Sequence, residues 1–208
     1  MRILLSFIIS LFFIQGISAQ SIVKDSVQKA IDDSLKMEKM KASLIYPILK
    51  AGDFSGVIPV KNLTEVPDPT INYKLLFELV INNTENEAKE INHGLTEICR
   101  ILNLHAASGI PVQNITPIIV VHAKALFAFY TNEAYQKKYK TDNPNIAVIE
   151  ELIKKTGIKF IACGQAMSFL EVLPEQMIPQ MNVSLTAQTV LSHYQLKGYK
   201  LYEIFEEK

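Results

Sequence analysis

The chain has 208 residues, and its 21 basic and 21 acidic side chains give a formal net charge of zero. This balance gives no reason to expect a nucleic acid or an anionic membrane surface as a partner. The two cysteines, Cys99 and Cys163, are too few for a disulfide framework in a chain of this length, although an oxidising compartment would allow one bridge.

The first 19 residues have the pattern of a secretory signal peptide. A positive charge at Arg2 precedes an apolar run over residues 3–14, and small residues lead up to Ala19. The run is too short to span a bilayer, so we expect cleavage after Ala19 and no membrane anchor afterwards. The protein is then periplasmic or secreted, and the remaining chain of about 190 residues fits one domain.

Residues 20–72 are expected to form an N-terminal extension that packs on the core. Apolar residues recur at helical spacing among Lys and Asp over residues 21–42, which predicts a surface helix. Four prolines and two glycines over residues 46–73 predict an irregular segment. The α/β domain itself is expected over residues 73–208.

The domain begins with an apolar run over residues 73–81, which is typical of a buried strand. Thr84 and Glu87 form a capping box, so a helix is expected to start just after this strand. Cys99 lies on the predicted buried stripe of that helix, between Leu95 and Leu102, and is therefore interpreted as a packing residue.

Two further apolar runs end in residues that can carry chemistry. The strand predicted over residues 115–121 ends at His122, and the strand predicted over residues 158–163 ends at Cys163, just before Gly164. Between them, Asn143-Pro144-Asn145 predicts a helix start. A short strand over 181–185, a helix over 186–196 and a last strand over 199–205 complete the expected elements.

Alternating strands and helices predict parallel βαβ units in a three-layer α/β/α sandwich with helices on both faces of the sheet. Because open α/β sheets bind ligands outside the carboxyl ends of their strands, Asn82, His122 and Cys163 are expected at one rim. Cys163 is either a reactive thiol or a small packing residue at the end of a buried strand. A Cys-His hydrolase is disfavoured because no third orienting residue is evident.

The sequence offers no cofactor or metal site. The turn after the first strand lacks the glycines that a pyrophosphate needs, which disfavours nucleotides and flavins. The histidines at 93, 105 and 193 lack metal-ligand spacing.

Several short motifs resemble the DsrE/DsrF-like family of sulfur-relay proteins. They are Ala162-Cys163-Gly164-Gln165, Val120-Val121-His122-Ala123, Asn143-Pro144-Asn145 and Gln195-Leu196-Lys197-Gly198-Tyr199. The resemblance covers residues 73–204, and the N-terminal segments are similar to those of an exported branch of this family. It implies a mainly parallel five-stranded sheet of flavodoxin-like type, assembly into trimers or hexamers, and a Cys at position 163 that accepts sulfane sulfur as a persulfide.

The leading hypothesis is therefore an exported sulfur carrier or sulfurtransferase-like protein that uses Cys163. Its partners would be a sulfur donor or acceptor, either a protein or a small sulfur compound. Asn82, His122, Gly164 and Gln165 are the candidate rim contacts. The alternative is a non-catalytic binding or assembly module on the same fold.

Reactivity of Cys163 requires an exposed and stabilised thiolate. The backbone N–H groups of the turn after Cys163, or His122, are expected to stabilise it, whereas Cys99 is expected to be inert. The two cysteines are not expected to be bridged, because one lies on a helix and the other at the rim. The aromatic cluster of Phe127, Phe129 and Tyr130 is interpreted as core or subunit interface, and we expect a homo-oligomer.

We predict that the exported protein begins at Gln20, because the one long apolar run precedes this residue. Intact mass spectrometry of protein recovered after export checks this prediction. A start well before Gln20, or an attached lipid, would contradict it.

Overall fold

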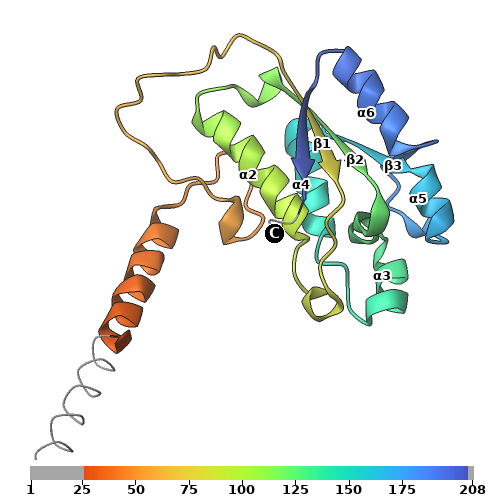
Figure 1. Ribbon diagram of the computed structural model, residues 1–208, viewed down its shortest axis with the longest axis horizontal. Helices are drawn as coiled ribbons and strands as arrows, with labels where there is room; N and C mark the ends of the chain where they lie inside the picture. The colour runs from red at the N-terminus through yellow and green to blue at the C-terminus, as the bar shows by residue number, and fades with distance from the viewer. Residues whose placement is uncertain (1–25, 206–208) are drawn as a thin grey trace, which may run out of the picture. The chain divides into compact units, whose positions relative to one another are not determined.

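The computed structural model describes residues 26–205. The predicted signal peptide, residues 1–19, lies outside the described residues. The chain divides into two compact units, Met1–Leu44 and Ile45–Lys208. The described part of the first unit is a helix over residues 26–43, in agreement with the predicted surface helix (Figure 1). Within residues 26–205, no helix combines the length and the apolar character needed to cross a membrane.

The second unit is built on a five-stranded sheet in which every neighbouring pair is parallel. The strand order is β4-β3-β2-β1-β5, so β4 and β5 are the edge strands. The strands are β1 (Tyr73–Leu79), β2 (Ile115–Val121), β3 (Lys159–Cys163), β4 (Met181–Ser184) and β5 (Lys200–Ile204). Each lies within a residue or two of its predicted position.

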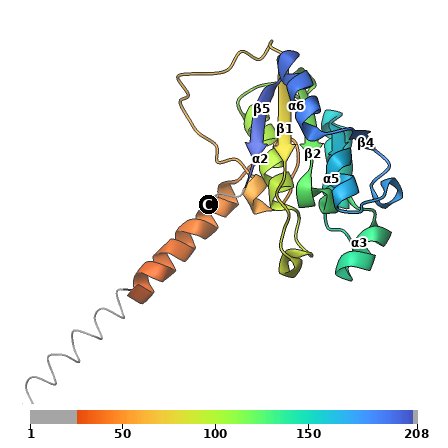
Figure 2. The same ribbon diagram turned by 45° about the vertical axis from the view of Figure 1, so that its right-hand side comes forward.

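Helices cover both faces of this sheet, as a parallel sheet requires. They are α2 (His93–Ala107), α3 (Asn132–Tyr139), α4 (Ile146–Thr156), α5 (Gly164–Phe169) and α6 (Ala187–Leu196). Buried residues of α2 and α4 belong to one apolar cluster, and those of α6 belong to another. Figure 2 shows α2 and α6 on opposite sides of the sheet. The predicted three-layer α/β/α class is confirmed.

The two apolar cores differ in size. The larger one, between the sheet and the pair α2 and α4, also contains Phe127, Phe129 and Tyr130. These three aromatic residues are buried within one chain, so they are core and supply no apolar surface for a subunit interface. The smaller one lies under α6 and consists of Leu76, Ile118, Val120, Ile161, Cys163, Ala187 and Leu191.

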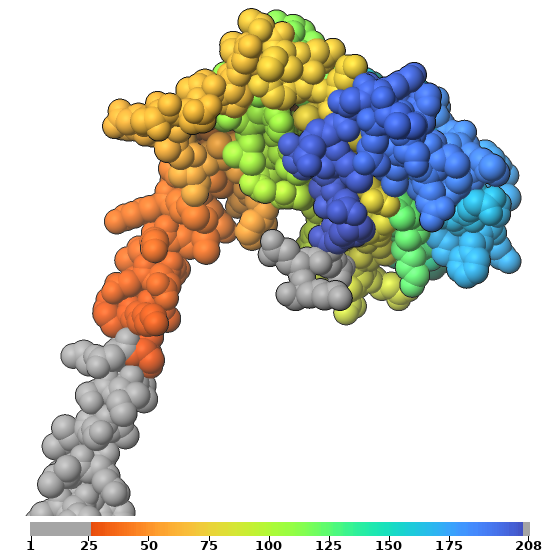
Figure 3. All heavy atoms as spheres, turned by 45° about the horizontal axis from the view of Figure 1, so that its top comes forward, coloured from red at the N-terminus to blue at the C-terminus, as the bar shows by residue number. Residues whose placement is uncertain are grey.

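The predicted N-terminal extension, residues 20–72, is divided between the two units. Residues from Ile45 belong to the same unit as the sheet. The reason is the buried Asn103 of α2, whose Nδ2 donates to the carbonyl oxygens of Leu49 and Ser55, at 2.8 and 2.9 Å. Its Oδ1 accepts the N–H of Ile48 at 2.8 Å. Residues 58–72 are exposed and run along the outside of this unit (Figure 3).

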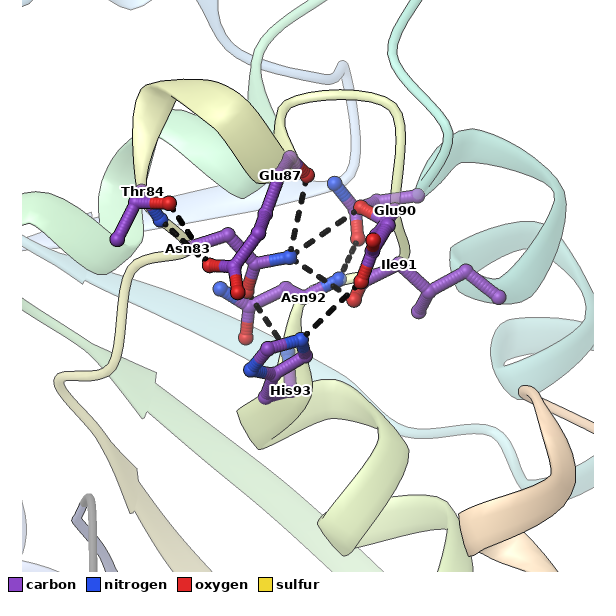
Figure 4. A network of polar contacts seen from close by, with 8 residues as sticks. Asn83, Thr84, Glu87, Glu90, Ile91, Asn92 and His93 are labelled. Atoms are coloured by element: carbon purple, nitrogen blue, oxygen red, sulfur yellow. Dashed lines mark hydrogen bonds and ion pairs between the residues drawn. The ribbon is translucent and has the colours of Figure 1, made fainter.

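The helix expected directly after β1 begins later than predicted. Thr84 and Glu87 do interact, since the Thr84 N–H donates to Glu87 Oε2 at 3.0 Å. These bonds also lower the pKa of the Glu87 carboxyl. However, they enclose only the short 3-10 helix η2 (Glu85–Glu87), and α2 starts at His93 with Asn92 as its cap (Figure 4).

The carboxyl edge of the sheet is held by a chain of three buried asparagines. Asn92 Nδ2 donates to the Ile81 carbonyl at 2.9 Å, and the Asn92 N–H donates to Asn145 Oδ1 at 2.7 Å. Asn145 Nδ2 donates in turn to Asn143 Oδ1 at 2.8 Å. Asn145 precedes α4, as predicted, but its side chain does not cap that helix and serves this chain of bonds instead.

Asn143 extends this chain of hydrogen bonds to two backbone carbonyl groups. Its Nδ2 donates to the carbonyl oxygens of Ala128 and Tyr130, at 3.0 and 2.6 Å. Both bonds are buried. Removing the amide would leave buried polar atoms without partners, which costs more than the bonds themselves contribute.

We predict that Asn143→Ala lowers the free energy of unfolding by about 2–4 kcal/mol. Urea denaturation followed by circular dichroism measures this change. Asn86→Ala, at an exposed position of η2, is the matched control and should change stability by less than about 0.5 kcal/mol. Equal stability of the two variants would contradict the assigned role of Asn143.

Candidate functional site

Cys163 is the last residue of β3, as predicted from the sequence. Its residue surface is only 5% exposed, because the thiol lies in the cluster covered by α6. The expectation of an exposed thiol is therefore wrong. The cover comes from a helix that begins 24 residues later in the chain, and the residues next to Cys163 carry no sign of it.

The turn after Cys163 does not supply the expected stabilisation of a thiolate. The Cys163 side chain accepts no hydrogen bond from the first turn of α5. The N–H of Gln165 donates instead to the Leu185 carbonyl at 3.1 Å. Gly164 and Gln165 thus bind the start of α5 to the loop after β4.

Gly164 is required by a close approach of two backbone segments. A Cβ atom at this position would lie 2.7 Å from the Ser184 carbonyl oxygen, which belongs to the backbone of β4. The same pair of strands is joined by the Ser184 hydroxyl, which donates to the Ala162 carbonyl at 3.1 Å. Gly164 therefore permits β3 and β4 to stay paired up to Cys163.

His122 lies beside Cys163 at the carboxyl edge. Val121 of β2 pairs with Ala162 of β3, so the next residues along each strand, His122 and Cys163, are opposite one another. His122 has an extended backbone and its N–H donates to the Leu79 carbonyl, which continues the sheet by one residue. Ala123 then adopts a left-handed conformation, with φ of 53°, and turns the chain into the 3-10 helix η4 (Ala123–Phe129).

Sequence reasoning missed the partner of His122. His122 Nε2 lies 2.9 Å from Oε1 of Glu78, a residue of β1. The side chains are 27% and 15% exposed, respectively. The signal available in the sequence was Glu78 itself, the single acidic residue in the otherwise apolar part of the first strand. Glu78 is the third residue, beside Cys163 and His122, that the sequence analysis did not find.

These three side chains share the face of the sheet that α6 covers. Along β1, Leu76 points into the cluster under α6, so Glu78, two residues later, points to the same face. Val120 and Ile161 also lie in this cluster, which places His122 and Cys163 on the same face by the same alternation. Ala187, the first residue of α6, is a member of the cluster too. The amino end of α6 thus approaches the layer that contains Cys163.

Asn82 does not join this group. It follows β1, its Nδ2 donates to the Asn83 carbonyl at 2.7 Å, and it lies on the same side as Tyr139 of α3. Both residues line an open groove of about 640 Å³ with Lys124, Phe127, Lys138 and Phe169, among others. Cys163 and His122 do not line this groove.

Cys99 is fully buried in α2, as expected for a packing residue. Burial raises the pKa of its thiol to about 12, so the thiol stays protonated at neutral pH. Both cysteines are free, and they lie in different apolar clusters, Cys99 in the larger one and Cys163 in the smaller one under α6. Within residues 26–205, no group of three or more His, Cys, Asp or Glu side chains has an arrangement that could hold a metal ion.

Comparison with known proteins identifies a family-level match. Residues 76–202, from within β1 to within β5, match the family model described as DsrE/DsrF-like family. A solved structure of a protein of unknown function from Methanobacterium thermoautotrophicum is similar over 63% of this chain and 98% of that chain, with 14% sequence identity and a TM-score of 0.46. Among curated proteins, none matches the chain.

We predict that Gly164→Ala destabilises the protein by about 1–3 kcal/mol, because β4 must move away to make room for the methyl group. Urea denaturation measures this loss. Ser168→Ala, at an exposed position of α5, is the control and should leave stability within about 0.5 kcal/mol of the wild type. A Gly164→Ala variant as stable as this control would show that the two strands are not closely held here.

Proposed function

Because the chain belongs to the DsrE/DsrF-like family, we propose that it is a sulfur carrier or sulfurtransferase-like protein that accepts sulfane sulfur as a persulfide on Cys163. The observation that carries this proposal is the position of Cys163 at the carboxyl end of β3, a strand that lies within the matched residues 76–202. We further propose that the protein acts after export, on the basis of the signal-peptide pattern of residues 1–19.

The proposed step is a transfer between two thiols without net oxidation. The Cys163 thiolate attacks the outer sulfur of a donor persulfide, and a bond forms between Cys163 Sγ and that sulfur. The sulfur–sulfur bond of the donor breaks, and the donor leaves as a thiolate that takes up the proton lost by Cys163. Transfer to an acceptor thiol is the reverse of this reaction.

The amino end of α6 supports the anionic form of Cys163 in this proposal. Unpaired backbone N–H groups give the start of a helix a partial positive charge, which lowers the free energy of a nearby thiolate. Thr186, the cap residue of α6, makes no side-chain hydrogen bond to the helix start. Ala187 and Cys163 belong to the same apolar cluster, which supports this end of α6, in place of the turn of α5, as the proposed source of stabilisation.

A non-catalytic binding or assembly module is the second candidate. The observation that favours it is the burial of Cys163, because a thiol that is 5% exposed can serve packing alone. A homo-oligomer is proposed under either function. Its support is a group of exposed apolar side chains on and beside the edge strand β4, namely Leu173, Val183 and Leu185, of which Leu173 and Val183 line one groove.

We predict that wild type and Cys99→Ala gain the mass of one sulfur atom when incubated with a persulfide or polysulfide donor, whereas Cys163→Ser does not. Cys99, with a pKa of about 12, is protonated at the neutral pH of the experiment and does not react. Mass spectrometry of the three proteins measures the loading. If Cys163→Ser loads like the wild type, or the wild type never loads, the sulfur-carrier proposal fails and the binding module takes its place.

A further inference from the structure

The pair of Glu78 and His122 is unusual for a strand of the sheet. Glu78 interrupts a strand whose neighbouring residues, Phe77 and Leu79, are fully buried. Partial removal of a carboxylate and an imidazole from water has a free-energy cost that their attraction repays only in part. A hydrophobic pair would join β1 and β2 at least as well, so packing alone does not account for these residues.

The hydrogen bond between them determines which imidazole nitrogen is available. An ionised carboxylate can only accept a hydrogen bond, so Nε2 of His122 carries the proton that is donated to Glu78. In the neutral ring, Nδ1 then keeps a free lone pair and can take up a proton. Within residues 26–205, no protein donor is hydrogen bonded to this Nδ1.

The thiol of Cys163 is the neighbouring group that has a proton to give. The pairing of Val121 with Ala162 makes His122 and Cys163 opposite residues on adjacent strands, with Cα atoms about 5 Å apart and both side chains on the face covered by α6. The thiol and the ring are not hydrogen bonded to each other in this arrangement. Catalytic hydrogen bonds of this kind often form only when the substrate is bound.

We propose that His122 is the general base and acid of Cys163, and that Glu78 is the positioning residue that holds His122 in the required tautomer. This inference rests on the proposed function and assigns the proton transfer within it. Nδ1 takes the proton of the Cys163 thiol as Sγ attacks the donor persulfide. It then gives this proton to the leaving thiolate, so the ring returns to its neutral form and the charges balance.

Within the described part of the chain, few other ionisable side chains lie close to Glu78, His122 and Cys163. Glu203 of β5 pairs with Glu78 in the sheet register and is an exposed carboxylate on the same face. The α6 residues that pack against this face are Ala187, Val190, Leu191 and Tyr194, and the first three are apolar. Tyr194 lies two turns from the start of the helix and contacts Tyr199 at the opposite end of the sheet. Lys124, two residues after His122, is exposed to solvent.

The test measures the rate at which Cys163 reacts with iodoacetamide as a function of pH, in the Cys99→Ala background. We expect His122→Gln to lower the rate at pH 7 by at least about tenfold, because a positioned base typically contributes 10² to 10⁴. Glu78→Gln keeps the size of the side chain but removes its charge, and should shift the midpoint of the pH–rate profile. Glu78→Asp should restore part of the wild-type profile.

His93→Gln is the matched control, since His93 lies in α2, on the other face of the sheet from Cys163, and its exposed Nε2 is 3.5 Å from Glu90 Oε2. Its pH–rate profile should equal that of the background protein. Profiles of folded His122→Gln and Glu78→Gln that equal the control would overturn the inference. If either variant does not fold, the other one, together with Glu78→Asp, decides the question.

Sulfur loading of the same variants separates this inference from the proposed function. If the wild type loads sulfur and His122→Gln loads it at the same rate, the acid–base role fails while the sulfur-carrier function stands. If the wild type does not load sulfur but His122→Gln still slows alkylation, the proposed function fails while the pairing of His122 with Cys163 stands.

Discussion

The chain of buried asparagines at the carboxyl edge is the constraint on which the site depends. Buried hydrogen bonds of Asn92, Asn145 and Asn143 connect the segment after β1, the end of η4 and the start of α4. Such a network specifies one arrangement, because any other leaves a buried amide or carbonyl without a partner. The segments that follow β1 and β2 are therefore positioned by polar hydrogen bonds, whereas the strands themselves are held mainly by apolar packing.

Two periodicities then bring the candidate site together. The alternation of side chains along a strand sends Glu78, His122 and Cys163 to one face, and the parallel register places them near the same end of three neighbouring strands. A shift of one residue in any strand would move its side chain to the opposite face, into the large apolar core. The strand register and the apolar pattern thus keep Glu78, His122 and Cys163 together, since neither can change without exposing core residues.

The sequence allowed the strands and their end residues to be predicted because both follow from local patterns. The apolar runs that end at His122 and Cys163 are sufficient for this, and the carboxyl ends of parallel strands share an edge. Three features depend on contacts between distant segments and escaped prediction. They are the late start of α2, the burial of Cys163 under α6, and the pairing of Glu78 with His122 across two strands. Asn143 and Asn145 were recognised as a motif, but their local pattern indicates helix capping rather than a buried network.

The unequal covering of the two sheet faces has a consequence for dynamics. On one face α2 alone buries seven residues, whereas on the other face α6 buries only Ala187 and Leu191. Segments with few buried apolar contacts open locally at a lower free-energy cost than the global unfolding reaction. Amide hydrogens of α6 should therefore exchange with solvent before those of α2. In the molecules in which α6 is open, the thiol of Cys163 meets solvent while the larger core stays intact. A donor would reach Cys163 during this opening, and the partial positive charge at the amino end of α6 would act on the sulfur only in the closed molecules.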